Sequence, residues 1–374
     1  MPPLARRNLF HDKIRFAVTL TGIVFSVVLI VVELGLFVGF TVTTSSIIDR
    51  SSADLWIVSR GTPYIEQGAP FPERKFYQVL ATPGVAAADK YIVRFSNWKA
   101  PDGSERGIQV VGFNPHSTLG GPWNIAAGDV ADLEKPDAVM VDEIYRKKLG
   151  VDRIGQIFEL NGRRARVVGF TRGIRAFTTT PYVFTSFKNA QDYARINEDQ
   201  TLFILVRTQA GTSVKALQNR LAARLTDVDV LTKDQFSRMT RFYWMFTTGA
   251  GIAVLIAALL GLVVGVVVVA QTIYATTMDH IREFGTLKAM GAANGYIYRV
   301  IITQAAISAV LGYAVAMVVS AFIVHASQSG GAAILLPWPM AIGIFFLALL
   351  MCISAAVVSI NKVTHLDPAM VFKG

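Results

Sequence analysis

Long apolar runs divide the chain into parts suited to a membrane and parts suited to water. About 20 apolar residues suffice to cross a bilayer, and four runs reach that length. They predict transmembrane helices at residues 17–40, 246–274, 297–324 and 337–360. The alternative interpretation of the first run is a cleaved signal peptide. The run is longer than a typical signal core, and no clear small-x-small cleavage site follows it. We therefore expect an uncleaved helix.

The segment between the first and second runs, residues 41–243, has the mixed pattern of an aqueous α+β domain. Asn161-Gly162 lies between two apolar stretches and predicts a tight hairpin. A βαβ-like half at each end and a β-rich insert at about 114–200 predict two subdomains, the first discontinuous. We expect strands at 54–58, 108–113, 138–141, 156–160, 165–170, 202–207 and 228–231, and helices at 72–80, 143–149 and 212–225.

Composition supports a membrane protein with a substantial aqueous part. Of 374 residues, 52% are hydrophobic and 17% are charged, and the mean hydropathy is +0.44. The net charge is +10, but residues 41–243 hold 27 basic and 21 acidic residues, so the charge is dispersed and argues against nucleic-acid binding. Cys352 is the single cysteine, which excludes an intramolecular disulfide and a cysteine cluster for zinc.

The distribution of basic residues predicts the orientation. Four basic residues precede the first run, which places a short amphipathic helix at 1–16 in the cytoplasm. Four crossings then return the tail, 361–374, to the cytoplasm, and both the tail and the 275–296 link carry lysine or arginine. The 41–243 domain and the 325–336 loop are expected outside, in the periplasm if the cell has one.

The link at 275–296 has the pattern of a short amphipathic helix joined directly to two membrane helices. Ile281, Phe284, Leu287 and Met290 recur every third residue and form one apolar stripe. Gly291 follows where a helix C-cap would lie. A plain positive-inside loop is the alternative, and spacing alone leaves it open.

Other single residues have a structural and a functional interpretation. Glu33 lies inside the first apolar run, where an acid is a functional candidate by default, although a structural role is favoured. Gly261 and Gly265 fit the small-xxx-small pattern of close helix contact, a common match. A basic run suits either an anionic ligand or lipid headgroup, or a solvated face, which we favour: Arg163, Arg164, Arg166, Arg172 and Arg175. The remaining aromatic candidates are interpreted as core or edge residues rather than ligand platforms: Trp56, Trp98 and Trp123.

No catalytic motif is evident. The sequence lacks the G-x-x-x-x-G-K-S/T phosphate loop, H-E-x-x-H, G-x-S-x-G and C-x-x-C, and His11 and His116 have no metal-ligand spacing. Four spans without a detectable inverted repeat are few for a secondary transporter. These observations favour a non-catalytic membrane component that needs an outside source of energy over a membrane-anchored enzyme.

The layout and two motifs resemble the FtsX-like permeases of ABC transporters. Residues 282–291, REFGTLKAMG, match the family pattern R-E-I/F-G-x-L/M-K/R-A-I/M-G after the second span, and residues 364–369 resemble its C-terminal ending. The opening at 4–15, the stretch 53–56 and the region 95–115 look most like DevC-type permeases. The external domain resembles the two-part periplasmic domain of MacB-type permeases.

This resemblance implies a homo- or heterodimeric permease of the bacterial inner membrane, bound to two copies of a separate ATPase that holds the ATP. The chain itself is expected to bind no cofactor or metal. MacB carries its ATPase on the same polypeptide, whereas here it is expected on a partner. The residues implied to couple to that ATPase are Ile281, Arg282, Glu283, Phe284, Gly285, Leu287, Lys288 and Gly291.

The family also implies a function. DevC- and MacB-type systems export cargo from the periplasm through an adaptor protein and an outer-membrane channel, which predicts export of a hydrophobic or amphiphilic cargo such as a lipid, glycolipid, lipoprotein or drug-like molecule. The alternative is an FtsX-like protein that transmits the ATP state to an extracytoplasmic cell-wall enzyme. The size of the 41–243 domain favours export.

Overall fold

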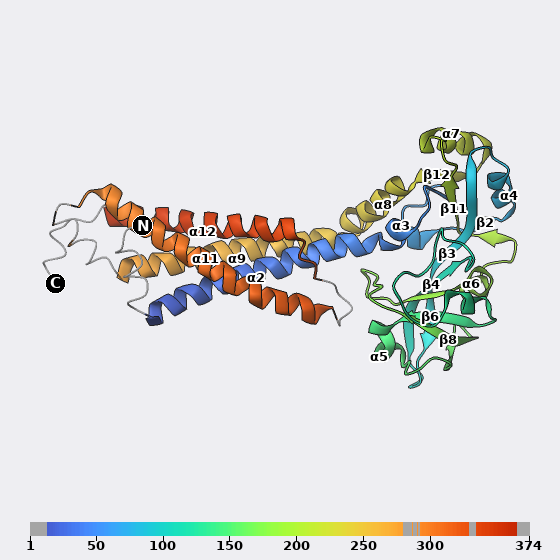
Figure 1. The fold of residues 1–374 in the computed structure, drawn as a ribbon, viewed down its shortest axis with the longest axis horizontal. Coiled ribbons are helices and arrows are strands. Elements are labelled where there is room, and N and C mark those ends of the chain that lie inside the picture. Colours follow the sequence, from blue (N-terminus) through green and yellow to red (C-terminus); the bar gives the residue numbers. More distant parts are fainter. Residues whose placement is uncertain (1–12, 280–285, 287–289, 291, 329–333, 365–374) are drawn as a thin grey trace. The chain divides into compact units, whose positions relative to one another are not determined.

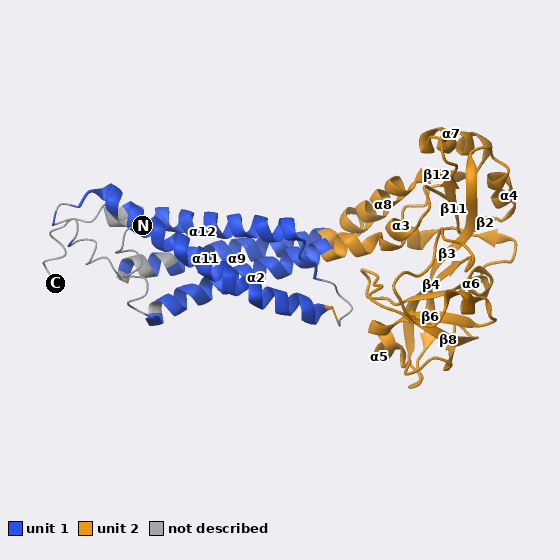
Figure 2. Cartoon of the chain, viewed as in Figure 1, with its two compact units in different colours: residues 1–38, 252–327, 334–374 blue, residues 39–251, 328–333 orange. Residues whose placement is uncertain are grey.

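The computed structural model describes residues 13–279, 286, 290, 292–328 and 334–364. Its chain divides into two compact units, shown in Figure 2. One unit, here called the bundle, holds residues 1–38, 252–327 and 334–374. The other, here called the module, holds residues 39–251 and 328–333. The module is therefore an insertion between the first and second helices of the bundle, as the sequence predicts.

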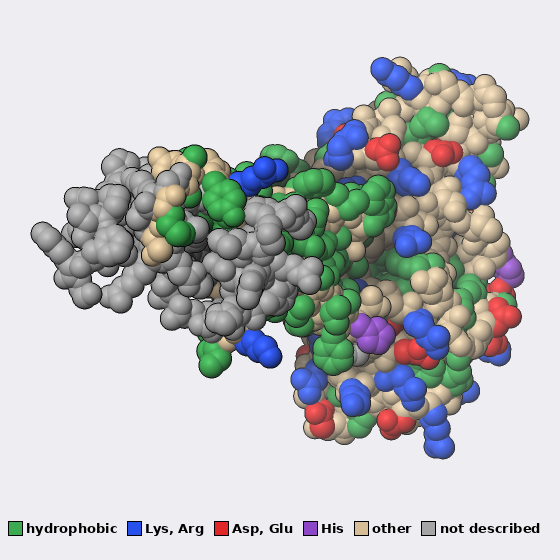
Figure 3. Space-filling model, turned by 60° about the vertical axis from the view of Figure 1, so that its left-hand side comes forward, with side chains coloured by type: hydrophobic (Ala, Val, Ile, Leu, Met, Phe, Trp, Pro, Cys, Tyr) green, Lys and Arg blue, Asp and Glu red, His purple; other side chains and the backbone are tan. Residues whose placement is uncertain are grey.

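The bundle consists of long apolar helices in its described part (Figure 1): α2 (Lys13–Thr44), α9 (Ala250–Asp279), α11 (Asn294–Ser327) and α12 (Trp338–Thr364). Each contains a stretch long and apolar enough to cross a membrane, which confirms the prediction of four transmembrane helices. At most 39% of any of these stretches is buried. Many large hydrophobic side chains of these helices are consequently exposed, and Figure 3 shows them gathered on the described surface that faces the viewer, as expected where lipid replaces water around a helix.

The first subdomain of the module is an antiparallel sheet in the order β12-β1-β11-β3. Helix α4 connects β1 to β3, and α7 connects β11 to β12, which gives two interlocked βαβ units of the ferredoxin-like kind. This arrangement agrees with the predicted βαβ-like half at the end of the module, whereas the half at its start is completed by β3, a strand that the sequence did not predict. The elements are β1 (Leu55–Ser59), α4 (Arg74–Leu80), β3 (Val85–Lys99), β11 (Phe203–Thr208), α7 (Val214–Arg224) and β12 (Val228–Thr232).

Both faces of this sheet are covered, which explains the continuous apolar runs in its strands. Leu55 and Ile57 of β1 pack with α4 and α7, whereas Trp56 and Val58 belong to the core on the opposite face. Successive side chains of a strand point to opposite faces. A strand that is buried on both sides therefore lacks polar alternation.

The second subdomain is β-rich and its strand ladder closes on itself. From the second half of β3 the pairing runs through β4, β9, β6, β8 and β7 and returns to β3. Asn161 and Gly162 join β7 to β8 with φ of 51° and 81°, the left-handed conformation that a tight hairpin of this type requires. The strands are β4 (Glu105–Phe113), β6 (Ala138–Asp142), β7 (Ile157–Leu160), β8 (Arg163–Thr171) and β9 (Tyr182–Ser186).

Strand β3 joins the two subdomains. Its residues 85–91 pair with β11 in the first sheet, and its residues 92–99 pair with β4 in the second. The second sheet therefore contains residues 92–113 in addition to the predicted insert at about 114–200. Because one strand runs through both sheets, the subdomains share a rigid backbone connection at residues 91–92.

Helix α6 (Phe187–Ala194) lies on the second sheet so closely that a Cβ added at Gly112 would fall 2.2 Å from the Cβ of Ala190. Helix α8 (Lys233–Phe242) begins with a capping box, in which Thr232 and Gln235 each accept the other's backbone N–H. The remaining elements are α3 (Ser46–Arg50), η1 (Ile65–Gln67), β2 (Phe71–Pro72), β5 (Ile125–Ala127), η2 (Val130–Glu134), η3 (Glu143–Tyr145), α5 (Arg146–Leu149), β10 (Gln200–Thr201) and η4 (Tyr243–Thr247).

Candidate functional site

The predicted coupling residues lie outside the described part of the chain. These are Ile281, Arg282, Glu283, Phe284, Gly285, Leu287, Lys288 and Gly291. Within the link, the backbone N–H of Met290 donates to the carbonyl of Thr286 at 3.0 Å, and the Met290 side chain is 71% exposed. The link joins the end of α9 at Asp279 to the start of α11 at Asn294. The coupling role of this stretch therefore stays a prediction. The predicted helix at 1–16 lies outside the description except for its last four residues.

Glu33 lies half-buried on α2. A Cβ added at Gly261 of α9 would lie 3.3 Å from the Cγ of Glu33, and one added at Gly265 would lie 3.3 Å from Ser26 and from Ile30. The two glycines thus lie against α2, and their small size lets the backbones of α2 and α9 approach closely. The packing suits a structural role for Glu33, while a functional role stays untested.

A hollow of about 450 Å³ lies between the two subdomains of the module and is here called the cleft. Helix α4 forms one side and α6 forms the other, with β3 between them. Its apolar lining includes Phe76 of α4, Phe113 of β4 and Phe187 of α6. The other lining residues are mostly polar or charged, so the cleft combines three aromatic rings with several polar groups.

Lys90 of β3 is the central charged group of the cleft. Its Nζ lies 2.6 Å from Oε1 of Glu73, and both side chains are largely buried, at 26% and 19% exposure. The same ammonium lies 4.6 Å from the ring centre of Phe187 and 5.8 Å from that of Phe76. It therefore links the first subdomain, through Glu73 and Phe76, to the second, through Phe187, by ion-pair and cation–π attraction.

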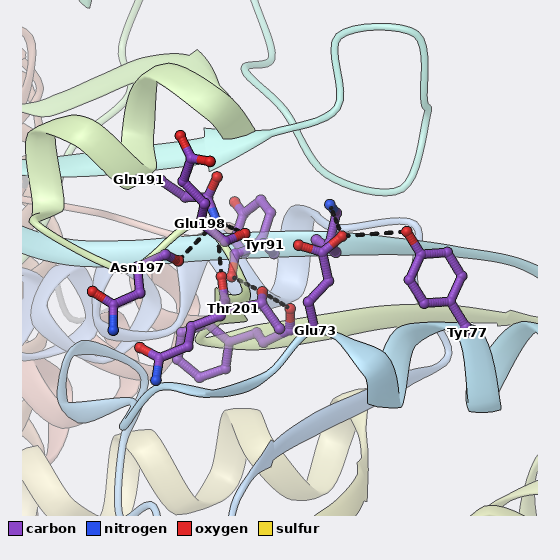
Figure 4. A network of polar contacts seen from close by, with 10 residues as sticks. Glu73, Tyr77, Tyr91, Gln191, Asn197, Glu198 and Thr201 are labelled. Atoms are coloured by element: carbon purple, nitrogen blue, oxygen red, sulfur yellow. Dashed lines mark hydrogen bonds and ion pairs between the residues drawn. The ribbon is translucent and has the colours of Figure 1, made fainter.

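Gln191 holds the loop at 197–200 in place beside the cleft. Figure 4 shows its amide group pointing at this loop. Its Nε2 donates to the carbonyl oxygens of Asn197, Glu198 and Gln200, at 3.2, 3.1 and 2.9 Å. The hydroxyl of Thr201 donates to the carbonyl of Phe203 at 2.9 Å. Buried side-chain amides that satisfy several backbone groups hold a loop in one conformation. This loop beside the cleft is therefore pre-formed.

The rim of the cleft is charged and solvent-exposed. Lys188 pairs with Glu198 at 3.3 Å, and both side chains are more than 70% exposed. Asp89 lies deeper and accepts hydrogen bonds from the amide of Asn114 at 2.9 Å and from the hydroxyl of Ser117. Aromatic walls with a mixed-charge rim suit an amphiphilic molecule or segment.

The other candidates from the sequence have structural environments. Arg164 pairs with Asp137 at 2.7 Å and Arg172 with Glu143 at 2.9 Å, on an exposed face. This agrees with the solvated interpretation for Arg164 and Arg172, whereas Arg175 is half-buried and its guanidinium donates to the carbonyl of Gln328. Trp56 and Trp98 are fully buried in the core. Among the described residues no group of three or more His, Cys, Asp or Glu could hold a metal ion.

Sequence reasoning missed the residues of the cleft and a second cluster, built around Glu66 and Trp244. The cleft draws on residues 73–76, 89–90, 113–115 and 186–198. No motif connects such distant segments. For the second cluster, the signal in the sequence was the density of aromatic residues at 242–246, immediately before the second apolar run.

Two family models together match most of the chain. A model of the MacB-like periplasmic core domain matches residues 16–224, and a model of the FtsX-like permease C-terminal region matches residues 255–368. The chain belongs to the FtsX-like, MacB-type permeases of ABC transporters. The break between the two models, at residues 225–254, falls where the module ends and α9 begins.

Related full-length proteins support this membership in the permease family. The chain is 25% identical over 380 residues to an uncharacterized ABC transporter permease of Mycobacterium tuberculosis (strain CDC 1551 / Oshkosh), covering 99% of both proteins. It is 23% identical over 364 residues to one of Mycobacterium bovis, covering 97% of this chain and 96% of the relative. The permease is accordingly a multi-pass membrane protein.

Solved structures with some likeness to the permease cover its module. The periplasmic region of MacB from Actinobacillus actinomycetemcomitans aligns with a TM-score of 0.38 and 11% identity, covering 50% of this chain and 92% of that one. The extracellular domain of the ABC-type transporter YknZ from Gram-positive bacteria aligns with a TM-score of 0.35 and 13% identity, covering 48% and 98%. Likeness at this level adds nothing to the family models, on which the assignment rests.

Proposed function

We propose that this permease couples ATP hydrolysis by a separate ATPase subunit to movement of its module, and that this movement drives export of a hydrophobic or amphiphilic cargo. The ATPase subunit holds the ATP, and the permease supplies no catalytic group. Two permease copies work as a dimer in the bacterial inner membrane. An adaptor protein and an outer-membrane channel take the cargo onward.

The observation that carries this proposal is the insertion of the module between α2 and α9. The module is attached to the bundle through residues 38–39 and 251–252, with a short additional piece at 328–333. A change in the spacing of the spans therefore reaches the module through α2 and α9. Long-range coupling needs an element that both sites bias, and the α9–α11 link is joined directly to one of these two spans.

The predicted chemistry of the link suits contact with a soluble partner. Phe284 and Leu287 would enter an apolar groove on the ATPase, and Arg282 and Lys288 would meet acidic groups there, in the manner of a helix bound in a groove. The proposal therefore puts the link and both termini in the cytoplasm, in agreement with the basic residues of the sequence. The module then lies outside the cell membrane, where the cargo and the adaptor are.

The cleft supports an amphiphilic rather than a purely polar cargo. Its walls present Phe76 and Phe187, and its rim presents Lys188 and Glu198. Apolar walls favour an acyl or aromatic group, while mixed charges at the rim tolerate a polar head of either sign. This lining supports the proposal of an amphiphilic cargo taken up by the module.

Co-expression with the ABC ATPase subunits of the same cell tests the partnership. The tagged permease is purified in detergent, and the ATPase that accompanies it is quantified for the wild type, for Phe284→Asp and for Phe95→Asp. Phe95 lies on β3 and is 46% exposed, so its substitution is a matched control on the module. We expect one ATPase to co-purify with the wild type and the control, and at least tenfold less with Phe284→Asp. Equal recovery with all three would contradict coupling through the link. Recovery of no ATPase would instead favour a receptor-like or signal-transmitting protein.

A further inference from the structure

A rare helical conformation lies immediately before the second span. Residues Tyr243–Thr247 form a π-helical turn between α8 and α9. It ends near Gly249, whose φ of 75° is left-handed. Single π-turns often lie at functional sites. A π-turn takes up about one residue more than an α-turn, so a change from π to α winding would turn the chain that follows by roughly 100°.

Trp244 is the central side chain of this turn. Its ring centre lies 4.5 Å from that of Phe177 and 5.3 Å from that of Tyr64. Tyr64 in turn stacks on Tyr243, with ring centres 4.0 Å apart and an interplanar angle of 21°. We call Phe40, Tyr64, Glu66, Phe177, Tyr243 and Trp244 the neck cluster.

The neck cluster contacts both connections to the bundle and both subdomains. Phe40 belongs to the last turns of α2 and meets Phe177 edge to face at 5.2 Å. Phe177 lies in the segment between β8 and β9 of the second subdomain, and Tyr64 follows β1 of the first. Four parts of the chain thus meet at Trp244 and its neighbours. This meeting point gives the segment before the second span side-chain contacts to both subdomains, in addition to the backbone connection between them at residues 91–92.

One polar contact joins Glu66 to the π-turn. The indole Nε1 of Trp244 donates to Oε2 of Glu66 at 3.3 Å. Glu66 is only 8% exposed, and within the described residues its Oε1 has no hydrogen-bond partner. Burial raises the pKa of this carboxyl to about 7. The titratable groups beside it are Tyr64 and Tyr182. Burial is the largest cause that raises the pKa of each, followed by Tyr243 for Tyr64 and by the charge of Glu66 for Tyr182. Among the described residues the Trp244 indole is the one side-chain donor to this carboxyl, and a buried polar atom without a partner costs free energy.

We propose that the Tyr243–Thr247 turn is a two-state joint that passes movement of the second span to both subdomains, and that the Glu66–Trp244 hydrogen bond locks it in the π conformation. This inference rests on the proposed function for the source of the movement. The lock itself is a property of the chain alone. The test therefore examines the lock separately from the movement that the ATPase would cause.

Hydrogen exchange of the full-length permease in lipid nanodiscs, read by mass spectrometry, tests the lock without any ATPase. Trp244→Phe keeps an aromatic ring and removes the N–H donor. Trp123→Phe is the matched control, since Trp123 contacts Phe184 away from the neck cluster. Loss of this hydrogen bond is expected to speed exchange of the amides at 243–248 by roughly 3- to 10-fold. Glu66→Gln, which keeps an acceptor oxygen, is expected to speed it less. Unchanged exchange in Trp244→Phe would overturn the lock.

The same peptides, followed in the complex with its ATPase, test the transmission. On addition of ATP and vanadate, we expect the wild type to change exchange at 243–248, at 62–68 and at 174–179. In Trp244→Phe we expect ATP and vanadate to change exchange at 243–248 but not at 62–68 or 174–179. Identical changes in both proteins at all three segments, with hydrolysis intact, would overturn the joint. Absence of an ATPase partner would overturn the proposed function, while the exchange of the chain alone would still decide the lock.

Discussion

The buried carboxyl of Glu66 makes the stability of the module depend on pH. Its pKa is raised from 4.5 to about 7 in the folded chain, with burial as the largest cause, and the hydrogen bond from Trp244 acts in the opposite direction. The folded protein therefore holds this proton more tightly than the unfolded chain does. Between pH 4.5 and 7 the folded state binds more protons, so stability falls as pH rises through this range.

The size of the effect follows from the shift. One pKa unit corresponds to 1.36 kcal/mol, so a rise of the pKa from 4.5 to about 7 gives on the order of 3 kcal/mol. For a domain of roughly 200 residues, 1 kcal/mol moves Tm by about 2–4 °C. We therefore expect Glu66 to lower the Tm of the module by roughly 6–12 °C between pH 4.5 and pH 8.

Thermal unfolding of the detergent-purified permease, followed by tryptophan fluorescence, measures this effect. Wild type and Glu66→Gln are compared at closely spaced pH values, because the other carboxylates contribute equally to both proteins and cancel in the difference. Glutamine stays neutral throughout, so the variant is expected to gain in Tm relative to the wild type as the pH rises. Parallel Tm curves for the two proteins would refute the assignment of a neutral, buried Glu66.

Two further predictions concern packing and buried hydrogen bonds. Gly265→Leu places new atoms against Ser26 and Ile30 and is expected to destabilise the bundle by about 1–3 kcal/mol. The control is Gly343→Leu, because a Cβ at Gly343 meets nothing within 4 Å. Equal melting temperatures of the two variants would contradict the α2–α9 contact. Asp142 is 1% exposed, and its carboxylate accepts hydrogen bonds from the hydroxyl of Thr171 and from two backbone N–H groups. Asp142→Ala is expected to lower the free energy of unfolding by about 3 kcal/mol in chemical denaturation. The control is Asp102→Ala, at an exposed loop residue, and an equal loss of stability there would show that burial is not the reason.

Regular patterns in the sequence predicted the fold where local chemistry decides it. The four apolar runs became the four long helices, because a bilayer leaves few alternatives to a helix. The hairpin at Asn161-Gly162 formed where predicted, since these two residues tolerate positive φ. Strands β1, β6 and β11 were evident because both of their faces are buried and their apolar runs are unbroken.

Elements with mixed patterns were missed. Strand β3 has fifteen residues, but Arg94, Ser96 and Asn97 interrupt its apolar pattern where its side chains are exposed or half-buried. Helix α6 has only eight residues and is held by packing on β4 rather than by its own propensity. The cleft and the neck cluster were beyond prediction, because their side chains come from segments that only tertiary pairing brings together.

The most direct test of the account is the ATP hydrolysis rate of the permease–ATPase complex in lipid nanodiscs, compared with that of the ATPase alone. We predict that the permease changes the rate at least severalfold, that Phe95→Asp keeps this change, and that Phe284→Asp returns the rate to that of the free ATPase. A rate that is the same with wild-type permease, with Phe284→Asp and with no permease would contradict the coupling of hydrolysis to this chain.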